Sequence, residues 1–86
     1  MLQIRFSSHA LKQLKKIDRP VALRIIDYLE RNVAPLDEPR QIGKALQGQL
    51  TNLWRYRIGD YRVIVEIQDS ELIIQVIKIG HRKDIY

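Results

Sequence analysis

Arginines recur at short intervals in the segment WRYRIGDYR, residues 54–62, which contains Arg55, Arg57 and Arg62. The guanidinium group is a planar fork of N–H donors that matches the oxygens of a phosphate group, and it stays protonated near neutral pH. Such a cluster can hold a phosphate group and stabilise the negative charge that develops on it during a reaction. The segment therefore indicates a preformed site for a polyanion.

A second group of reactive side chains ends the chain in the segment IGHRKDIY, residues 79–86. His81 is suited to proton transfer near neutral pH, because histidine titrates there without any perturbation. Arg82 is a further phosphate ligand, and Tyr86 offers an aromatic face on which a base can stack. The other histidine, His9, has no evident partner, and without cysteine we expect no metal site.

Structural explanations exist for each of these residues. The arginines could belong to a solvated face on which Glu66 is the local counterion. His81 could be solvated, and Tyr86 could pack on the core. The functional interpretation gains weight because the histidine segment follows directly on the predicted sheet.

Period-two alternation from Leu53 onward predicts the strands that position the arginines. We expect strands near 53–58, 61–68 and 71–79, joined by turns at Gly59-Asp60 and Asp69-Ser70. The first turn pairs Arg57 with Arg62 and Arg55 with Ile64, on the face away from the core. Like charges opposite each other on adjacent strands cost stability, so a bound polyanion would relieve a repulsion that the free fold tolerates.

The N-terminal half predicts the elements that complete the domain. Leu2–Phe6 alternate as a short strand, and a helix follows over roughly 8–16 with Ser7 or Ser8 as its cap. A second helix begins after Asp18 and ends before Pro35. A linker over 34–52 leads to the strands. The fold class is α+β: a single domain over 1–86 in the order β-α-α-β-β-β, with two helices packed on one face of a mainly antiparallel four-stranded sheet.

Composition limits the classes of function. The chain has 86 residues and a net charge of +5, from 15 basic and 10 acidic residues, which favours polyanionic partners. No apolar run approaches the roughly 20 residues that span a membrane, and the N-terminus lacks the apolar region of a signal peptide. We expect a cytoplasmic protein that does not contact the membrane.

The segments KALQGQLTNLWRYRIGDYRVIVEI and VIKIGHRKDIY, in a chain with this order of elements, resemble RelE-type toxins of the RelE/ParE toxin–antitoxin superfamily. The resemblance implies the toxin of a type II toxin–antitoxin module, an endoribonuclease that cuts mRNA on the ribosome and inhibits translation. It implies cleavage by attack of a 2′-hydroxyl on the adjacent phosphate, without a cofactor. The implied partners are a cognate antitoxin, the ribosome and mRNA. We expect the antitoxin to use an acidic, partly helical segment.

The resemblance also assigns roles to individual residues. The implied catalytic residues are Arg57, Arg62, His81, Arg82 and Tyr86, and the implied RNA-binding residues are Lys44 and Arg55. The strand positions are lysines in the best-known members, and related branches carry a carboxylate where this chain has Lys44. Because arginine is a poor proton carrier, His81 or Lys44 is left to move protons. A ParE-like inhibitor of DNA gyrase and a non-catalytic binding module on the same fold are the alternatives.

Overall fold

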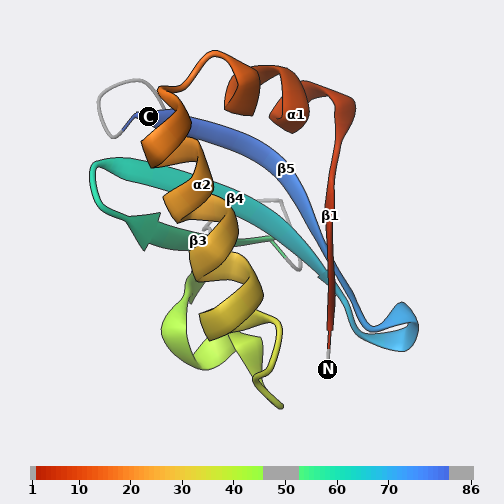
Figure 1. The fold of residues 1–86 in the computed structure, drawn as a ribbon. Coiled ribbons are helices and arrows are strands. Elements are labelled where there is room, and N and C mark those ends of the chain that lie inside the picture. The colour runs from red at the N-terminus through yellow and green to blue at the C-terminus, as the bar shows by residue number, and fades with distance from the viewer. Residues whose placement is uncertain (1, 46–52, 82–86) are drawn as a thin grey trace.

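The computed structural model describes residues 2–45 and 53–81, which form two helices over one sheet (Figure 1). The strands are β1 (Gln3–Phe6), β2 (Lys44–Ala45), β3 (Leu53–Ile58), β4 (Tyr61–Gln68) and β5 (Ile73–His81). The helices are α1 (Ser8–Lys15) and α2 (Arg19–Tyr28), with a π-helix η1 (Leu29–Val33) and 3-10 helices η2 (Pro39–Ile42) and η3 (Asp69–Glu71). The predicted α+β class and the two-helix layer are confirmed.

The sheet has five strands in the order β1-β5-β4-β3-β2. Only β1 and β5 run parallel, so the sheet is mainly antiparallel as predicted. The fifth strand is an addition: β2 lies within the predicted linker, where its two residues pair with Arg55 and Trp54 of β3. A strand of two residues has no measurable alternation, so the sequence pattern could not reveal it.

The core lies between the two helices and the helix-covered face of the sheet. The largest fully buried side chain is Tyr56 of β3, packed with aliphatic residues. Those of the sheet are Val63, Val65, Ile67, Ile74, Val76 and Ile79; those of the helices are Ile25, Leu29 and Val33, with Ala10 and Leu14 from α1. Each large side chain buried in this way stabilises the fold by about 1.5–3 kcal/mol.

Both predicted helix starts are observed. The Ser7 hydroxyl accepts a hydrogen bond from the backbone N–H of Ala10 at 3.0 Å, so Ser7 is the cap of α1. Asp18 occupies the cap position of α2 without a side-chain bond, and Pro20 lies in the first turn, where its missing N–H is not needed. The second helix passes into η1 and ends before Pro35, as predicted.

The connection between β4 and β5 differs from the predicted two-residue turn. Asp69–Glu71 form η3, and Leu72 follows in the left-handed region with φ of 56°. Strand β5 consequently begins at Ile73 and runs to His81, two residues later at each end than predicted. The hydrophobic Leu72 had suggested continued strand, yet its side chain is 59% exposed at the tip of the loop.

A β-bulge interrupts the pairing of β4 with β5. Ile64 pairs with Lys78 and Val65 with Val76, which leaves Ile77 as an extra residue on β5. Ser7 is anchored at this bulge, because its N–H bonds to the Val76 carbonyl at 2.8 Å and its hydroxyl to the Ile77 carbonyl at 3.3 Å. The extra residue exchanges the two faces of the sheet for every later side chain of β5.

Candidate nucleic-acid interface

The predicted register of β3 and β4 is confirmed at every pair. Arg57 lies opposite Arg62, and Arg55 opposite Ile64, on the face away from the helices, here called the open face. Arg57 is exposed, whereas Arg62 is half-buried and its Nε and Nη1 atoms are shielded from solvent. The fold therefore holds two guanidinium groups opposite each other on adjacent strands, and a bound anion would reduce the repulsion between these like charges.

The unexpected strand β2 enlarges this cluster. Lys44 pairs with Arg55, Arg55 with Ile64, and Ile64 with Lys78, so one row crosses four strands of the open face. Lys44 and Lys78 are both exposed. Sequence reasoning missed Lys78, because the bulge before it changes the face on which its side chain lies. The consecutive apolar residues Val76 and Ile77 were the signal that could have revealed this bulge.

Glu66, the proposed local counterion, lies in a different row of the open face. It is opposite Leu53 and Gln75, and its carboxylate accepts a hydrogen bond from the side-chain amide of Gln68 at 2.7 Å. The row that contains Arg57 and Arg62 continues to Gly80, which has no side chain. The open face is therefore most strongly cationic at the end near the β3–β4 turn.

His81 is on the other face of the sheet. It pairs with Tyr61, and the two rings meet edge to face with centroids 5.5 Å apart. The histidine lines a hollow of about 290 Å³ with residues of α1, including Gln13 and Lys16. The structure thus does not bring His81 beside the arginines of the open face, because the bulge at Ile77 reverses its side. Arg82 and Tyr86 lie outside the described residues, so their predicted placement is untested.

An ion-pair cluster at the opposite end of β4 holds η2 in place. Arg40 donates to both carboxylate oxygens of Asp69, at 3.1 and 2.7 Å, and to Glu38 at 3.0 Å. The hydrogen bonds to Asp69 and Glu38 raise the pKa of Arg40, and the same contact lowers the pKa of Asp69. The guanidinium also lies 5.8 Å from the ring centroid of Trp54.

A second contact fastens the segment before β2. The hydroxyl of buried Tyr56 donates to the Pro39 carbonyl at 2.7 Å, and burial raises the pKa of this phenol to about 12. Gly43 packs closely there: a Cβ atom at this position would lie 3.0 Å from the Tyr56 ring and 3.2 Å from the Arg55 carbonyl. These contacts align β2 with β3 and so place Lys44 beside Arg55.

Two other kinds of site were sought among the described residues. Within 2–45 and 53–81, no cluster of three or more histidine, aspartate or glutamate side chains could hold a metal ion. The helices in those same ranges are too short and too polar to cross a membrane.

Comparison with known proteins places the chain in a family. The family model described as the ParE toxin of the type II toxin–antitoxin system, parDE, matches residues 4–86. The chain belongs to this family, and its class is therefore the toxin of a type II toxin–antitoxin module in the RelE/ParE superfamily. The resemblance found in the sequence is confirmed.

Similar proteins within the superfamily are RelE-like. Toxin RelG and Toxin RelE of Mycobacterium tuberculosis (strain ATCC 25618 / H37Rv) are each 26% identical over 83 residues, which cover 96% of this chain and 93% and 84% of theirs. The toxin–antitoxin complex RelBE2 from Mycobacterium tuberculosis contains a chain with a TM-score of 0.83 at 24% identity, covering 96% of this chain and 93% of that one. The RelB–RelE antitoxin–toxin complex from Methanococcus jannaschii gives 0.72 at 27% identity, with 95% and 94% covered.

Proposed function

We propose that this toxin is an endoribonuclease that cuts mRNA on the ribosome and thereby inhibits translation. The observation that carries the proposal is the arginine pair Arg57–Arg62 on the open face, continued by Arg55 and Lys44. The likeness to proteins named RelE and RelG supports the same reading. Because ribosomes and mRNA are the targets, the toxin acts in the cytoplasm.

The reaction requires alignment, charge stabilisation and two proton transfers. The 2′-oxygen of one nucleotide bonds to the adjacent phosphorus, and the bond from phosphorus to the 5′-oxygen breaks. The products are a 2′,3′-cyclic phosphate and a 5′-hydroxyl end. The 2′-hydroxyl loses its proton to a base, and the leaving 5′-oxygen gains one from an acid. No oxidant, reductant or cofactor is needed for this balance.

The proposed roles of the open-face residues agree with their positions, and those of Arg82 and Tyr86 are carried over from the sequence. Arg57 and Arg62 face the phosphate and stabilise the charge of its five-coordinate state, a task that Arg82 shares in our proposal. Lys44 and Arg55, one row further from the turn, hold the RNA backbone. A base of the mRNA stacks on Tyr86.

His81 remains our proposed proton carrier, acting as general acid toward the 5′-oxygen. Because its ring lies on the helix-covered face, it reaches a phosphate on the open face only around the end of the sheet. Gly80 leaves room for that approach, since no side chain stands opposite Arg62 there. Lys44, which lies on the open face itself, is the alternative carrier.

The proposed protein partner is a cognate antitoxin. Similar proteins have been crystallised with their antitoxins, as in the RelBE2 complex and the RelB–RelE complex. We propose that an acidic, partly helical segment of the antitoxin covers the open face or displaces the C-terminal residues of the toxin. A stable complex that leaves Arg57 and Arg62 exposed and correctly placed would contradict this mode of silencing.

The decisive experiment adds the purified toxin to a translation reaction and maps the ends of the mRNA. We expect new 5′ ends within codons on ribosomes, and none on the same mRNA without ribosomes. A matched mRNA with 2′-deoxy nucleotides at the mapped position should stay intact. Cleavage of the deoxy substrate would eliminate the 2′-hydroxyl mechanism.

The ParE family model supports a second candidate, inhibition of DNA gyrase. A supercoiling assay tests it directly, with the same toxin preparation. Inhibited supercoiling together with intact mRNA would transfer the assignment to gyrase. If neither assay responds, a non-catalytic binding module is the remaining alternative.

A further inference from the structure

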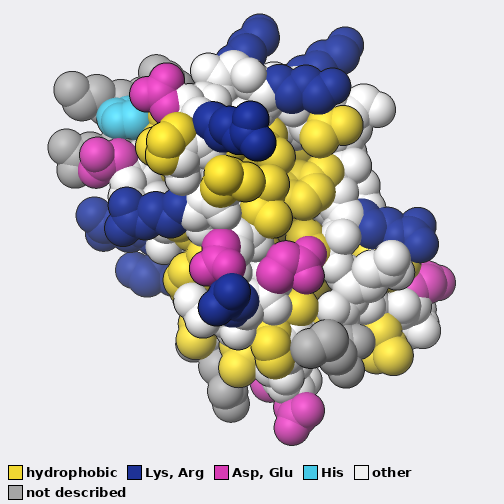
Figure 2. Space-filling view, viewed as in Figure 1, with side chains coloured by type: hydrophobic (Ala, Val, Ile, Leu, Met, Phe, Trp, Pro, Cys, Tyr) yellow, Lys and Arg dark blue, Asp and Glu magenta, His cyan; other side chains and the backbone are white. Residues whose placement is uncertain are grey.

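A groove separates α2 from the turn between β3 and β4. One hollow of about 240 Å³ is lined by Arg24, Asp27, Tyr28, Asn32, Arg57, Ile58 and Gly59. An adjoining hollow of about 170 Å³ is lined by Val21, Arg24, Ile25, Ile58, Gly59, Asp60 and Tyr61. The two share Arg24 and the turn, so they form one groove with Arg24 at its centre. Figure 2 shows Lys and Arg side chains at the margins of this face, around a hydrophobic middle.

Positive charge dominates the larger hollow. Arg24 and Arg57 are both exposed, and neither forms an ion pair with any carboxylate of the described residues. The one carboxylate in its lining, that of Asp27, is held by Arg31 at 2.7 Å. Two guanidinium groups thus line this hollow, and the one carboxylate among its described lining residues already forms an ion pair with Arg31. Asn32 adds an amide donor to the same wall.

The turn provides the room for Arg24. Gly59 has a φ of +59°, and a Cβ atom placed there would lie 4.0 Å from the Arg24 Nη1 atom. The guanidinium of α2 therefore reaches over the turn at the one residue that has no side chain. The exposed carboxylate of Asp60 lines the smaller hollow only.

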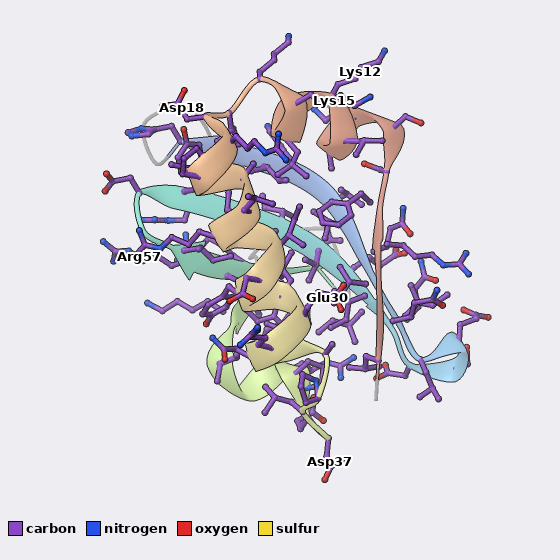
Figure 3. All side chains as sticks on the ribbon, viewed as in Figure 1. Lys12, Lys15, Asp18, Glu30, Asp37 and Arg57 are labelled. Atoms are coloured by element: carbon purple, nitrogen blue, oxygen red, sulfur yellow. The ribbon has the colours of Figure 1, made fainter. Side chains whose placement is uncertain are left out.

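Arg57 connects this groove with the open face. In the register it belongs to the open face opposite Arg62, but β2 pairs only with Trp54 and Arg55. The described part of β3 beyond Arg55 is therefore an edge, and the Arg57 side chain also lines the groove, at the end of β3 beside α2 (Figure 3). A chain of phosphates bound on the open face can continue past Arg57 to Arg24.

We propose that the groove binds a second phosphate of the RNA strand, held between Arg24 and Arg57. The inference rests on the proposed function for the identity of the strand, and it adds Arg24 as a binding residue. A phosphodiester suits the site because guanidinium forks bind its two free oxygens. An acidic side chain of the antitoxin would fit the same charge, so the experiment below compares RNA binding with antitoxin binding.

Salt-dependent binding of a non-cleavable RNA tests the proposal. The probe is a labelled single-stranded 2′-O-methyl oligonucleotide, titrated with the full-length toxin at several salt concentrations. Each phosphate contact to a single strand contributes about 0.7 to the slope of log K against log salt. Arg24→Gln should lower the magnitude of this slope by about 0.7. Arg19→Gln is the matched control, because Arg19 is exposed on the same helix but lines neither hollow, and its slope should equal that of the parent.

A second pair of variants uses the carboxylate of Asp27, which forms an ion pair with Arg31. Arg31→Gln removes the partner of Asp27 and leaves an uncompensated acid in the groove, so RNA binding should weaken although Arg31 itself is outside it. The double variant Asp27→Asn with Arg31→Gln should restore the affinity. A role of Arg31 in helix stability alone would not produce this rescue.

The outcomes separate this inference from the proposed function. An unchanged slope for Arg24→Gln overturns the phosphate site even if the parent toxin cuts mRNA. A reduced slope upholds the site even if the parent fails to cut. If Arg24→Gln weakens the complex with the antitoxin and leaves RNA binding intact, the groove is a contact for that protein, and the proposal is wrong.

Discussion

The two ends of strand β4 carry charge in opposite ways. At the β3–β4 turn, Arg57 and Arg62 lie opposite each other, and Arg24 approaches from α2. At the β4–β5 turn, Arg40 is bound by Asp69 and Glu38. The same residue type is thus neutralised within the fold at one end and concentrated at the other. The ion pairs of Arg40 hold a segment of the chain in place. The like charges of Arg57 and Arg62 cost stability and are suited to binding an anionic ligand.

The largest expected effect tests whether the catalytic site near the β3–β4 turn extends from the open face to the helix-covered face of the sheet. His81 pairs with Tyr61 at this end but on the other face. If the whole end of the sheet is catalytic, His81→Gln should slow single-turnover cleavage on the ribosome by about 10²–10⁴-fold, the usual contribution of general acid–base catalysis. His9→Gln is the matched control, because His9 is exposed on α1. Cleavage by His81→Gln at the parental rate across pH would restrict the catalytic site to the open face.

Replacing Arg57, which lies opposite Arg62, and Arg40, which is paired with Asp69 and Glu38, should have opposite effects on cleavage and on stability. Arg57→Leu should slow cleavage by about 10²–10³-fold, as the loss of a charge-stabilising donor does. Its stability should stay equal or rise by a few tenths to about 1 kcal/mol, because the repulsion from Arg62 disappears. Arg40→Leu should retain cleavage and lose about 0.2–1 kcal/mol. Urea denaturation and ribosomal cleavage of both variants measure this; a clear loss of stability in Arg57→Leu would make that residue structural.

The buried phenol of Tyr56, which donates a hydrogen bond to the Pro39 carbonyl, should make the stability of the fold depend on pH in the alkaline range. Burial raises the pKa of Tyr56 to about 12 from 10.0, so the phenol stabilises the fold fully below pH 10. Between pH 10 and 12 the unfolded chain ionises first, and stability should fall by up to about 1.4 kcal/mol per pH unit. Tyr56→Phe should cost about 0.5–1.5 kcal/mol at pH 7 and lack this alkaline decline. Denaturation curves of the two proteins that stay parallel up to pH 12 would contradict the assignment.

The smallest effect appears at low pH. Arg40 lowers the pKa of Asp69 below its ordinary 3.8, so the pair stabilises the fold above that pH. As the pH falls through the lowered pKa, Asp69 becomes protonated and the contribution is lost. Asp69→Asn should remove this acid-dependent part of the unfolding curve while leaving cleavage intact. The change should be small, because exposed ion pairs are screened by solvent. An identical acid dependence in both proteins would mean that the ion pair adds nothing to stability.

Sequence reasoning predicted the pairing of β3 with β4 correctly, because local rules determine this part of the structure. Gly59-Asp60 and clear alternation on both sides were enough to obtain the pairing of Arg57 with Arg62. Sequence reasoning did not predict the features that depend on tertiary contacts. The pairing of Lys44 with Arg55 depends on buried contacts of Tyr56 and Gly43, and no local pattern expresses them. The meeting of Arg24 with the turn depends on the packing of α2.

Sequence reasoning did not assign His81 to a face of the sheet. The predicted strand ended near Ile79, whereas β5 continues to His81 and its alternation breaks at Val76 and Ile77. The extra residue at Ile77 reverses the face of every later side chain of β5, so His81 lies on the helix-covered face. Consecutive apolar residues inside an alternating strand were the available signal for the bulge.

The same bulge bears on how such a toxin can change in evolution. Deleting the single codon for Ile77 would leave Val76 opposite Val65 and Lys78 opposite Ile64, so regular pairing would return and every later pair would stay the same. Lys78 would stay in the cationic row, Ile79 in the core and His81 opposite Tyr61. Gain or loss of one residue at this position can therefore be absorbed as a bulge, so related toxins can differ in the length of this strand without moving their C-terminal chemistry to the other side of the sheet.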